Sequence, residues 1–217
     1  MVLPDSQDLT LEIEGIRLNG NLSLPKEATG LVVFAHGSGS SRLSVRNQAV
    51  ARKLNVDYKL GTLLFDLLSP DEEPEGEYAR DKRFDIPLLS RRVAGAVGWC
   101  QRDERTRSLA IGCFGASTGA AAAIRAAASH AAVKAVVSRG GRVDLADEAL
   151  DTVTAPVLMI VGENDPQVLQ LNREAAARLK AEHKLTIIPH ATHLFEEPGT
   201  LDEAADHAGE WFQRHLR

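Results

Sequence analysis

Apolar and polar residues alternate in two different ways along this chain. Residues 9–14 and 16–24 alternate singly, which predicts two antiparallel strands with Gly15 between them. Farther along, short apolar runs are continuous, and a continuous run is typical of a strand buried on both faces of a parallel sheet. These runs lie at residues 31–35, 61–68, 108–114, 134–138, 156–161 and 184–188.

Longer segments with helical spacing separate the runs. Helices are predicted at residues 43–54, 90–101, 120–128, 171–181 and 201–216. The alternation of strand and helix predicts an α/β fold: about eight strands in a mostly parallel sheet, an antiparallel pair at the N-terminal edge, and helices on both faces. A length of 217 residues favours a single domain spanning residues 1–217.

One irregular stretch, residues 69–87, is rich in Pro, Glu and Asp and then in Arg. It is too polar to form a second domain. We expect a long loop at the carboxyl end of the fourth strand, which is the edge where α/β proteins bind ligands.

Composition narrows the classes of function. No apolar run reaches 18 residues and the N-terminus lacks the pattern of a secretory signal, so neither membrane insertion nor export is expected. A net charge of −5 argues against a nucleic-acid partner. Cys100 and Cys113 form no Cys-x-x-Cys or Cys/His cluster, so we expect no metal and a cytoplasmic location.

The sharpest chemical signal is the segment Gly-Ala-Ser-Thr-Gly at residues 115–119. It joins a predicted strand directly to a predicted helix, and a serine at such a turn presents its hydroxyl above the sheet as a nucleophile. The glycines leave room for close packing around the turn. The motif alone also fits an ordinary connection built from small residues, but its position after a buried strand favours Ser117 as a nucleophile.

A serine nucleophile needs a base, and His193 is the best placed of the seven histidines, just after the last predicted strand. His190 is a competitor three residues earlier, closer to the strand end and less free to reach across the sheet. Either one alone could be a solvated loop histidine.

The acid that orients the base is predicted to be Asp165, which follows the seventh strand. Glu163 and Asp144 are alternatives, and an aspartate in such a turn often only caps a helix. Asp165 is preferred because the order Ser, Asp, His then falls after strands five, seven and eight, which is the order of an α/β-hydrolase sheet.

Two backbone N–H groups could stabilise a developing oxyanion. Thr118 lies at a predicted helix N-terminus, where partial positive charge collects. The glycine-rich loop at residues 36–41 follows the third strand, and the N–H of Ser38 is expected to face the same pocket. The loop lacks the spacing of a phosphate-binding motif. We expect His36 to brace this loop and take no part in catalysis.

Four segments carry a resemblance to a known family. They are residues 34–41, 114–120, 138–142 (Ser-Arg-Gly-Gly-Arg) and 191–199. The chain resembles the α/β-hydrolase superfamily and, within it, the dienelactone hydrolase-like branch, over nearly its whole length. Related sequences also occur fused to phosphoribosyltransferase domains. The resemblance implies that Ser117 is the nucleophile, Asp165 the acid and His193 the base.

The nucleophile departs from the family pattern, because dienelactone hydrolases proper use a cysteine. Serine at this position favours ordinary ester hydrolysis over lactone hydrolysis. The hypothesis is a serine carboxylesterase that acts on small esters through an acyl-enzyme, with no metal or organic cofactor. Alternatives are a dienelactone or lactone hydrolase, a thioesterase or peptidase with the same triad, and a non-catalytic binding module of this fold.

The segment at residues 139–155 is too short for a helical lid, so the site should be open and should favour short acyl chains. We expect a small ester as the only partner, and a monomer or homodimer. Loop arginines are usually solvated, but Arg139 and Arg83 are candidates to contact a substrate carboxylate, as are Arg80 and Arg142.

Overall fold

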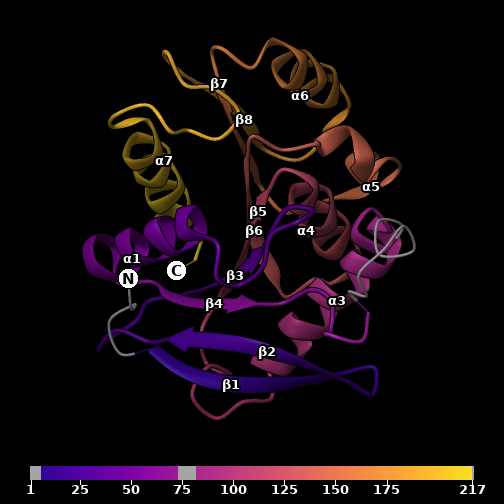
Figure 1. The fold of residues 1–217 in the computed structure, drawn as a ribbon, viewed down its shortest axis with the longest axis vertical. Helices are drawn as coiled ribbons and strands as arrows, with labels where there is room; N and C mark the ends of the chain where they lie inside the picture. The colour runs from indigo at the N-terminus through magenta and orange to yellow at the C-terminus, as the bar shows by residue number, and fades with distance from the viewer. Residues whose placement is uncertain (1–5, 73–81, 217) are drawn as a thin grey trace.

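The computed structural model describes residues 6–72 and 82–216. Within these ranges the chain forms an eight-stranded sheet in the order β1-β2-β4-β3-β5-β6-β7-β8 (Figure 1). The pairs β1–β2 and β2–β4 are antiparallel and the rest are parallel. The predicted fold class is confirmed. The strands are β1 (Ser6–Ile13), β2 (Ile16–Ser23), β3 (Leu31–Ala35), β4 (Gly61–Phe65), β5 (Ile111–Ala116), β6 (Val133–Arg139), β7 (Val157–Gly162) and β8 (His183–Ile188).

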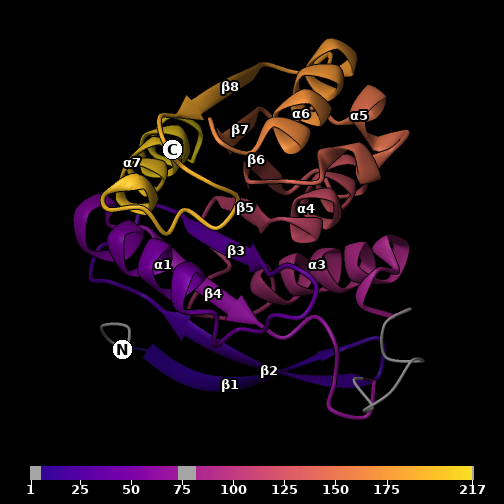
Figure 2. The same ribbon diagram turned by 45° about the horizontal axis from the view of Figure 1, so that its top comes forward.

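Helices cover both faces of the sheet (Figure 2). They are α1 (Val45–Tyr58), α3 (Ile86–Cys100), α4 (Thr118–Ser129), α5 (Ala149–Thr152), α6 (Pro166–Arg178) and α7 (Thr200–His215). Helices α1 and α7 pack together on one face, while α3 and α4 pack together on the other. Alternate residues of β3 enter the two cores: Val33 packs on the α3/α4 side, and Val32 and Phe34 pack on the α1/α7 side.

None of the helices in the described ranges is both long and apolar enough to cross a membrane.

Helix α3 begins four residues before the start predicted at residue 90. The Asp85 carboxylate accepts the N–H of Leu88 at 2.9 Å and so caps the helix, and Pro87 occupies its first turn. Both residues are favoured at a helix start. Residues 86 and 87 of the stretch expected to be a loop, 69–87, therefore belong to α3, and residues 73–81 of that stretch lie outside the described residues.

Helix α7 is held on α1 by polar contacts as well as by apolar packing. Lys53 Nζ lies 3.0 Å from a carboxylate oxygen of Asp206, and the Tyr58 hydroxyl donates to Asp206 at 2.8 Å. A Cβ at Gly209 would fall 2.4 Å from the Tyr58 ring, so the two helices approach closely. The C-terminal helix is thereby joined to the first helix of the chain.

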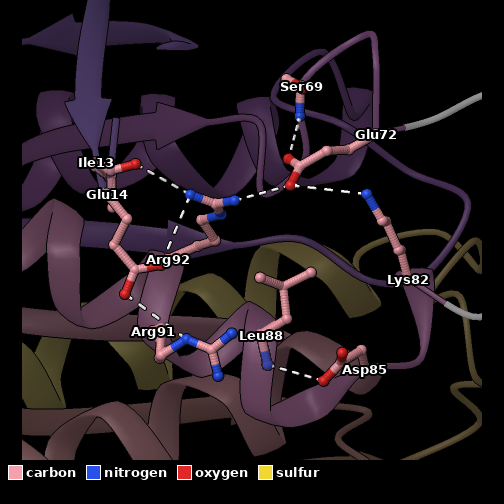
Figure 3. A network of polar contacts seen from close by, with 9 residues as sticks. All are labelled: Ile13, Glu14, Ser69, Glu72, Lys82, Asp85, Leu88, Arg91 and Arg92. Atoms are coloured by element: carbon pink, nitrogen blue, oxygen red, sulfur yellow. Dashed lines mark hydrogen bonds and ion pairs between the residues drawn. The ribbon is translucent and has the colours of Figure 1, made fainter. Parts of the chain in front are cut away.

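The flanks of the loop after β4 are tied to α3 through a buried ion pair (Figure 3). Arg92 donates to Glu72 Oε1 at 2.8 Å and to the Ile13 carbonyl at 3.0 Å. Glu72 also accepts the N–H of Ser69 at 3.0 Å, and Lys82 Nζ lies 4.0 Å away. Through Glu72 and Arg92, the segment that directly follows β4 is therefore tied to α3 and to the end of β1.

Candidate active site

Ser117 forms the turn between β5 and α4 alone, because β5 ends at Ala116 and α4 begins at Thr118. Its backbone is strained, with φ 50° and ψ −121°, a conformation that non-glycine residues rarely adopt. The Ser117 N–H donates to the Arg139 carbonyl at 3.2 Å, and the Ser117 carbonyl accepts the N–H of Arg142 at 3.0 Å. Backbone hydrogen bonds to the end of β6 thus hold the strained turn in place.

Glycines on either side let this turn pack tightly, as the sequence predicts. A Cβ at Gly115 would fall 2.4 Å from the Ala120 Cα. A Cβ at Gly119 would fall 2.2 Å from the Ala35 carbonyl oxygen. Any side chain at either position would force α4 away from the sheet, and Ser117 would move with it.

Asp165 and His193 meet across the ends of β7 and β8. His193 Nδ1 lies 2.6 Å from Asp165 Oδ2, and the carboxylate is mostly buried. Asp165 precedes α6, but its side chain makes no capping hydrogen bond, so the alternative of a helix-capping aspartate is not what the structure contains. With Nδ1 facing the carboxylate, Nε2 is the ring nitrogen left to serve a nucleophile.

Ser117 and His193 line the same cavity of about 170 Å³, together with the loop that follows β3. Of the sequence-predicted set, Asp165 and His193 are therefore in direct contact, and Ser117 and His193 share a cavity at the carboxyl edge of the sheet.

The alternative residues have other partners. The Asp144 carboxylate pairs side by side with the Arg142 guanidinium at 2.9 and 2.8 Å. Glu163 accepts the backbone N–H of His190 at 2.9 Å. The His190 side chain is 88% exposed. None of these three residues lines the cavity that Ser117 and His193 share.

Gly140 packs against His193, a contact that the sequence pattern did not predict. Its φ is +53°, and a Cβ there would lie 3.2 Å from the His193 carbonyl oxygen and 3.5 Å from Nδ1. Its N–H donates to the Ile160 carbonyl at 2.7 Å. A pair of glycines directly after a buried strand was the available signal for such a close approach.

The two expected oxyanion donors lie side by side but differ in what they bind. Thr118 is the first residue of α4, so its own helix offers no carbonyl to its N–H. The N–H of Ser38 does not point freely into the cavity as expected, because it donates to the Thr118 Oγ1 at 2.8 Å. A threonine hydroxyl within reach of this N–H competes with any oxyanion for it.

His36 braces the loop after β3, in keeping with its expected role. Its Nε2 accepts the N–H of Leu67 at 3.1 Å, and its Nδ1 lies 3.0 Å from the Gly37 carbonyl oxygen. The imidazole thereby connects the end of β3 to the segment after β4.

Arg139 is the last residue of β6 and lines the cavity beside Ser117. It is only 7% exposed, and its guanidinium lies 5.8 Å from the Phe195 ring centre. Nη2 is 3.4 Å from Asn47 Oδ1, while Nε and Nη1 have no hydrogen-bond partner among the described residues. Burial, with a smaller contribution from the nearby Arg46 charge, lowers the pKa of Arg139 to about 10.

The other candidate arginines lie elsewhere. Arg83 lines a separate small cavity of about 10 Å³ beside the loop after β3. Arg142 pairs with Asp144, as described above. Arg80 lies outside the described residues.

The sequence matches a known protein family and curated relatives. Residues 63–216 match the model of the dienelactone hydrolase family. Over 198 residues the chain is 52% identical to a Mycobacterium tuberculosis (strain H37Rv) protein named "Putative phosphoribosyl transferase". The match covers 91% of this chain and 44% of that protein, so the chain spans less than half of this relative's length.

Solved structures agree in fold. A dienelactone hydrolase from Anabaena variabilis superposes with a TM-score of 0.94 at 48% identity, covering 99% of this chain and 100% of that one. Est1E from Butyrivibrio proteoclasticus reaches 0.78 at 18% identity, covering 95% and 98% of the two chains. XC6422 from Xanthomonas campestris, described as a serine hydrolase without a lid, reaches 0.76 at 20% identity, covering 99% and 97%. By its fold and by the match over most of its length, the chain belongs to the dienelactone hydrolase family of the α/β-hydrolase fold.

Proposed function

We propose that the protein is a serine hydrolase that cleaves small carboxylic esters. The observation that carries the proposal is the contact of Asp165 with His193 at 2.6 Å, because His193 lines the same cavity as Ser117 in its strained turn. The backbone of Ser117 is strained, and hydrogen bonds hold it in that conformation. Such strain is typical of a nucleophile in a preorganised site.

In the proposed reaction, Ser117 Oγ attacks the ester carbonyl while His193 Nε2 accepts its proton. Asp165 stabilises the imidazolium that forms. The carbonyl oxygen becomes negative and accepts a hydrogen bond from the Thr118 N–H at the positive end of α4. His193 then protonates the leaving alkoxide, and a water activated by the same imidazole hydrolyses the acyl-enzyme.

The Ser38 N–H is the second proposed oxyanion donor. Because it already donates to the Thr118 hydroxyl, it must either divide its hydrogen bond or exchange the hydroxyl for the oxyanion. We propose exchange during the attack, since a charged acceptor forms a stronger hydrogen bond than a neutral hydroxyl.

Lactone hydrolysis is a second candidate, favoured by the 48% identity to a protein described as a dienelactone hydrolase. A lactone is a cyclic ester, so the same attack would open the ring without releasing a separate alcohol. Cys113 cannot supply the cysteine nucleophile typical of the family, because it is fully buried in β5. The ratio of ring opening to linear ester cleavage distinguishes the two candidates.

The test compares the wild type with Ser117→Ala on p-nitrophenyl acetate. We expect Ser117→Ala to lose activity by roughly 10³-fold or more, because the nucleophile acts as a unit with its base. Ser129→Ala is the matched control, since Ser129 ends the same helix and its hydroxyl donates to the Ala126 carbonyl at 3.1 Å. An organophosphonate should label Ser117 covalently. Equal activity in wild type and Ser117→Ala, with no label, would rule the proposal out.

A further inference from the structure

Helix α6 carries one amide among the apolar residues that it turns toward the protein interior. Its buried residues are Val168, Leu169, Asn172 and Ala175, whose spacing of three and four places them on one face of the helix. Asn172 is fully buried, and a buried amide costs free energy unless it is hydrogen-bonded. An apolar side chain is the ordinary choice on such a face, so the asparagine calls for a specific reason.

The side chain of Asn172 joins α6 to the segment that follows β6. Its Nδ2 donates to the Gly141 carbonyl at 2.8 Å and to the Val168 carbonyl of its own helix at 2.8 Å. Because both partners are acceptors, the NH₂ end of the amide must face them. Its Oδ1 has no hydrogen-bond partner among the described residues. The bond from α6 to Gly141 is thus made at the cost of a buried oxygen that no described residue pairs.

The segment that this bond holds, residues 139–142, contacts two of the three proposed catalytic residues. Two backbone hydrogen bonds, at 3.2 and 3.0 Å, join it to Ser117. Its Gly140 packs on His193, where a Cβ would lie 3.5 Å from Nδ1. A shift of this segment would therefore displace the proposed nucleophile and the proposed base together.

The third proposed catalytic residue lies at the start of the same helix. Asp165 directly precedes α6, and its carbonyl accepts the N–H of Leu169 at 2.9 Å. Backbone hydrogen bonds make the first turns of a helix a stiff unit. A bond at Asn172 therefore also limits where the Asp165 carboxylate can lie.

We propose that Asn172 is a positioning residue for the three proposed catalytic residues. Its bond to the Gly141 carbonyl fixes the helix that follows the acid against the segment that contacts the nucleophile and the base. The inference rests on the proposed function for the roles of those three residues. Asn172 itself does not line the cavity that Ser117 and His193 share, so it acts through the segment and the helix and does not touch the substrate.

The kinetic test uses Asn172→Leu, which removes both donors and keeps a side chain of similar size. We expect kcat on p-nitrophenyl acetate to fall about 10- to 100-fold and KM to stay within about 2-fold, because misplaced catalytic groups slow the reaction more than they weaken binding. Thermal unfolding monitored by circular dichroism reports whether the variant folds. Asn172→Ala provides a second variant without the donors if Asn172→Leu does not.

Asn55→Leu is the matched control. Asn55 is also buried, its Nδ2 donates to the Leu60 carbonyl at 2.7 Å and to Thr62 Oγ1 at 3.1 Å, and its Oδ1 has no partner among the described residues. It lies on α1 and does not line the cavity. We expect this variant to lose a similar amount of stability and to keep its kcat. A kcat that Asn172→Leu leaves unchanged, or that falls equally in Asn55→Leu, overturns the proposal.

Hydrogen exchange tests the anchoring without any turnover. The N–H groups of Gly140 and Arg142 both donate to backbone carbonyls. We expect these two amides, followed singly by NMR, to exchange about 10-fold faster or more in Asn172→Leu than in the wild type, and at the wild-type rate in Asn55→Leu.

The two measurements separate this proposal from the proposed function. A wild type that hydrolyses no ester rejects the proposed function, and faster exchange in Asn172→Leu alone then still supports the anchoring of residues 139–142. Ester hydrolysis by the wild type, with unchanged exchange in Asn172→Leu, supports the esterase and rejects the positioning role of Asn172.

Discussion

Two residues with positive φ shape the candidate site. Ser117, the proposed nucleophile, forms the turn after β5, and Gly140 lets the end of β6 approach His193. That Ser117, Asp165 and His193 follow strands that end at one edge of the sheet was predictable, because strand order favours Asp165 over Asp144. The Thr118 hydroxyl was not, since its contact with Ser38 joins residues 80 positions apart through the exact spacing of two loops.

Gly140→Ala tests the close approach to His193. We expect it to lower the free energy of unfolding by about 1 kcal/mol, because an L side chain is strained at this φ, and to lower kcat by displacing the imidazole. Gly15→Ala is the matched control, with φ +75° and open space around its Cβ. It should lose comparable stability and keep its activity. Chemical denaturation measures the stability of both variants, and ester kinetics measure their kcat. Equal kcat in the two variants would show that Gly140 does not position His193.

Arg139 illustrates why burial is hard to read from the sequence. It looked like one of several loop arginines, which are usually solvated. In the structure it extends β6 by one residue beyond the apolar run and turns its guanidinium inward. Helix α1 and the segment around Phe195 cover that end of the strand and bury the charge. These contacts join distant parts of the chain, so the residues next to Arg139 in the sequence do not predict them.

At the scale of elements, the eight strands and the five longer helices of the described residues were predicted, with boundaries shifted by a few residues. The start of α3 had a readable signal in Asp85 and Pro87. The buried pair between Arg92 and Glu72 had no such signal (Figure 3). Glu72 is one of several acidic residues in a polar stretch, and nothing in the sequence distinguishes it as the partner of Arg92.

Glu72→Gln tests what this pair contributes. The change leaves Arg92, whose side chain is 4% exposed, without its carboxylate. We expect the free energy of unfolding to fall by about 2 kcal/mol, because the buried Arg92 charge loses its 2.8 Å partner and keeps only the more distant Glu14 carboxylate. Glu14→Gln is the control: its carboxylate approaches Arg92 at 3.9 Å but is half exposed, so its loss should matter little. Urea denaturation of both variants decides, and equal losses would argue against a special role for Glu72.

At the scale of the whole molecule, both cysteines lie within the core. Burial raises the pKa of Cys113 to about 12 and raises that of Cys100 as well. A raised pKa keeps each thiol protonated and unreactive at neutral and mildly alkaline pH. We expect Ellman's reagent at pH 8 to label neither thiol in the native protein and both in guanidinium chloride. Rapid labelling of the native protein, with loss of activity, would contradict this and reopen cysteine catalysis.

The size of the cavity makes a further prediction about acyl chains. Burying a methylene is worth about 0.8 kcal/mol, but a cavity of about 170 Å³ offers a long chain little room. Between β6 and β7 the helical residues amount to a four-residue 3-10 helix and the four-residue α5. We expect kcat/KM on p-nitrophenyl esters to be highest from acetyl to butyryl and to fall for chains of about ten carbons. A steady rise with chain length would contradict this.

The strand order also suggests the order in which the parts of the candidate site form during folding. The proposed nucleophile needs β3, β5 and α4, all encoded before residue 130, whereas the proposed acid and base need β7 and β8. Strand β8 is the edge of the sheet, and α7 docks on α1 from the opposite end of the sequence. Contacts between distant segments form slowly. A refolding chain should therefore hold its serine in place before that serine has a base, and the ability to react marks the completion of folding.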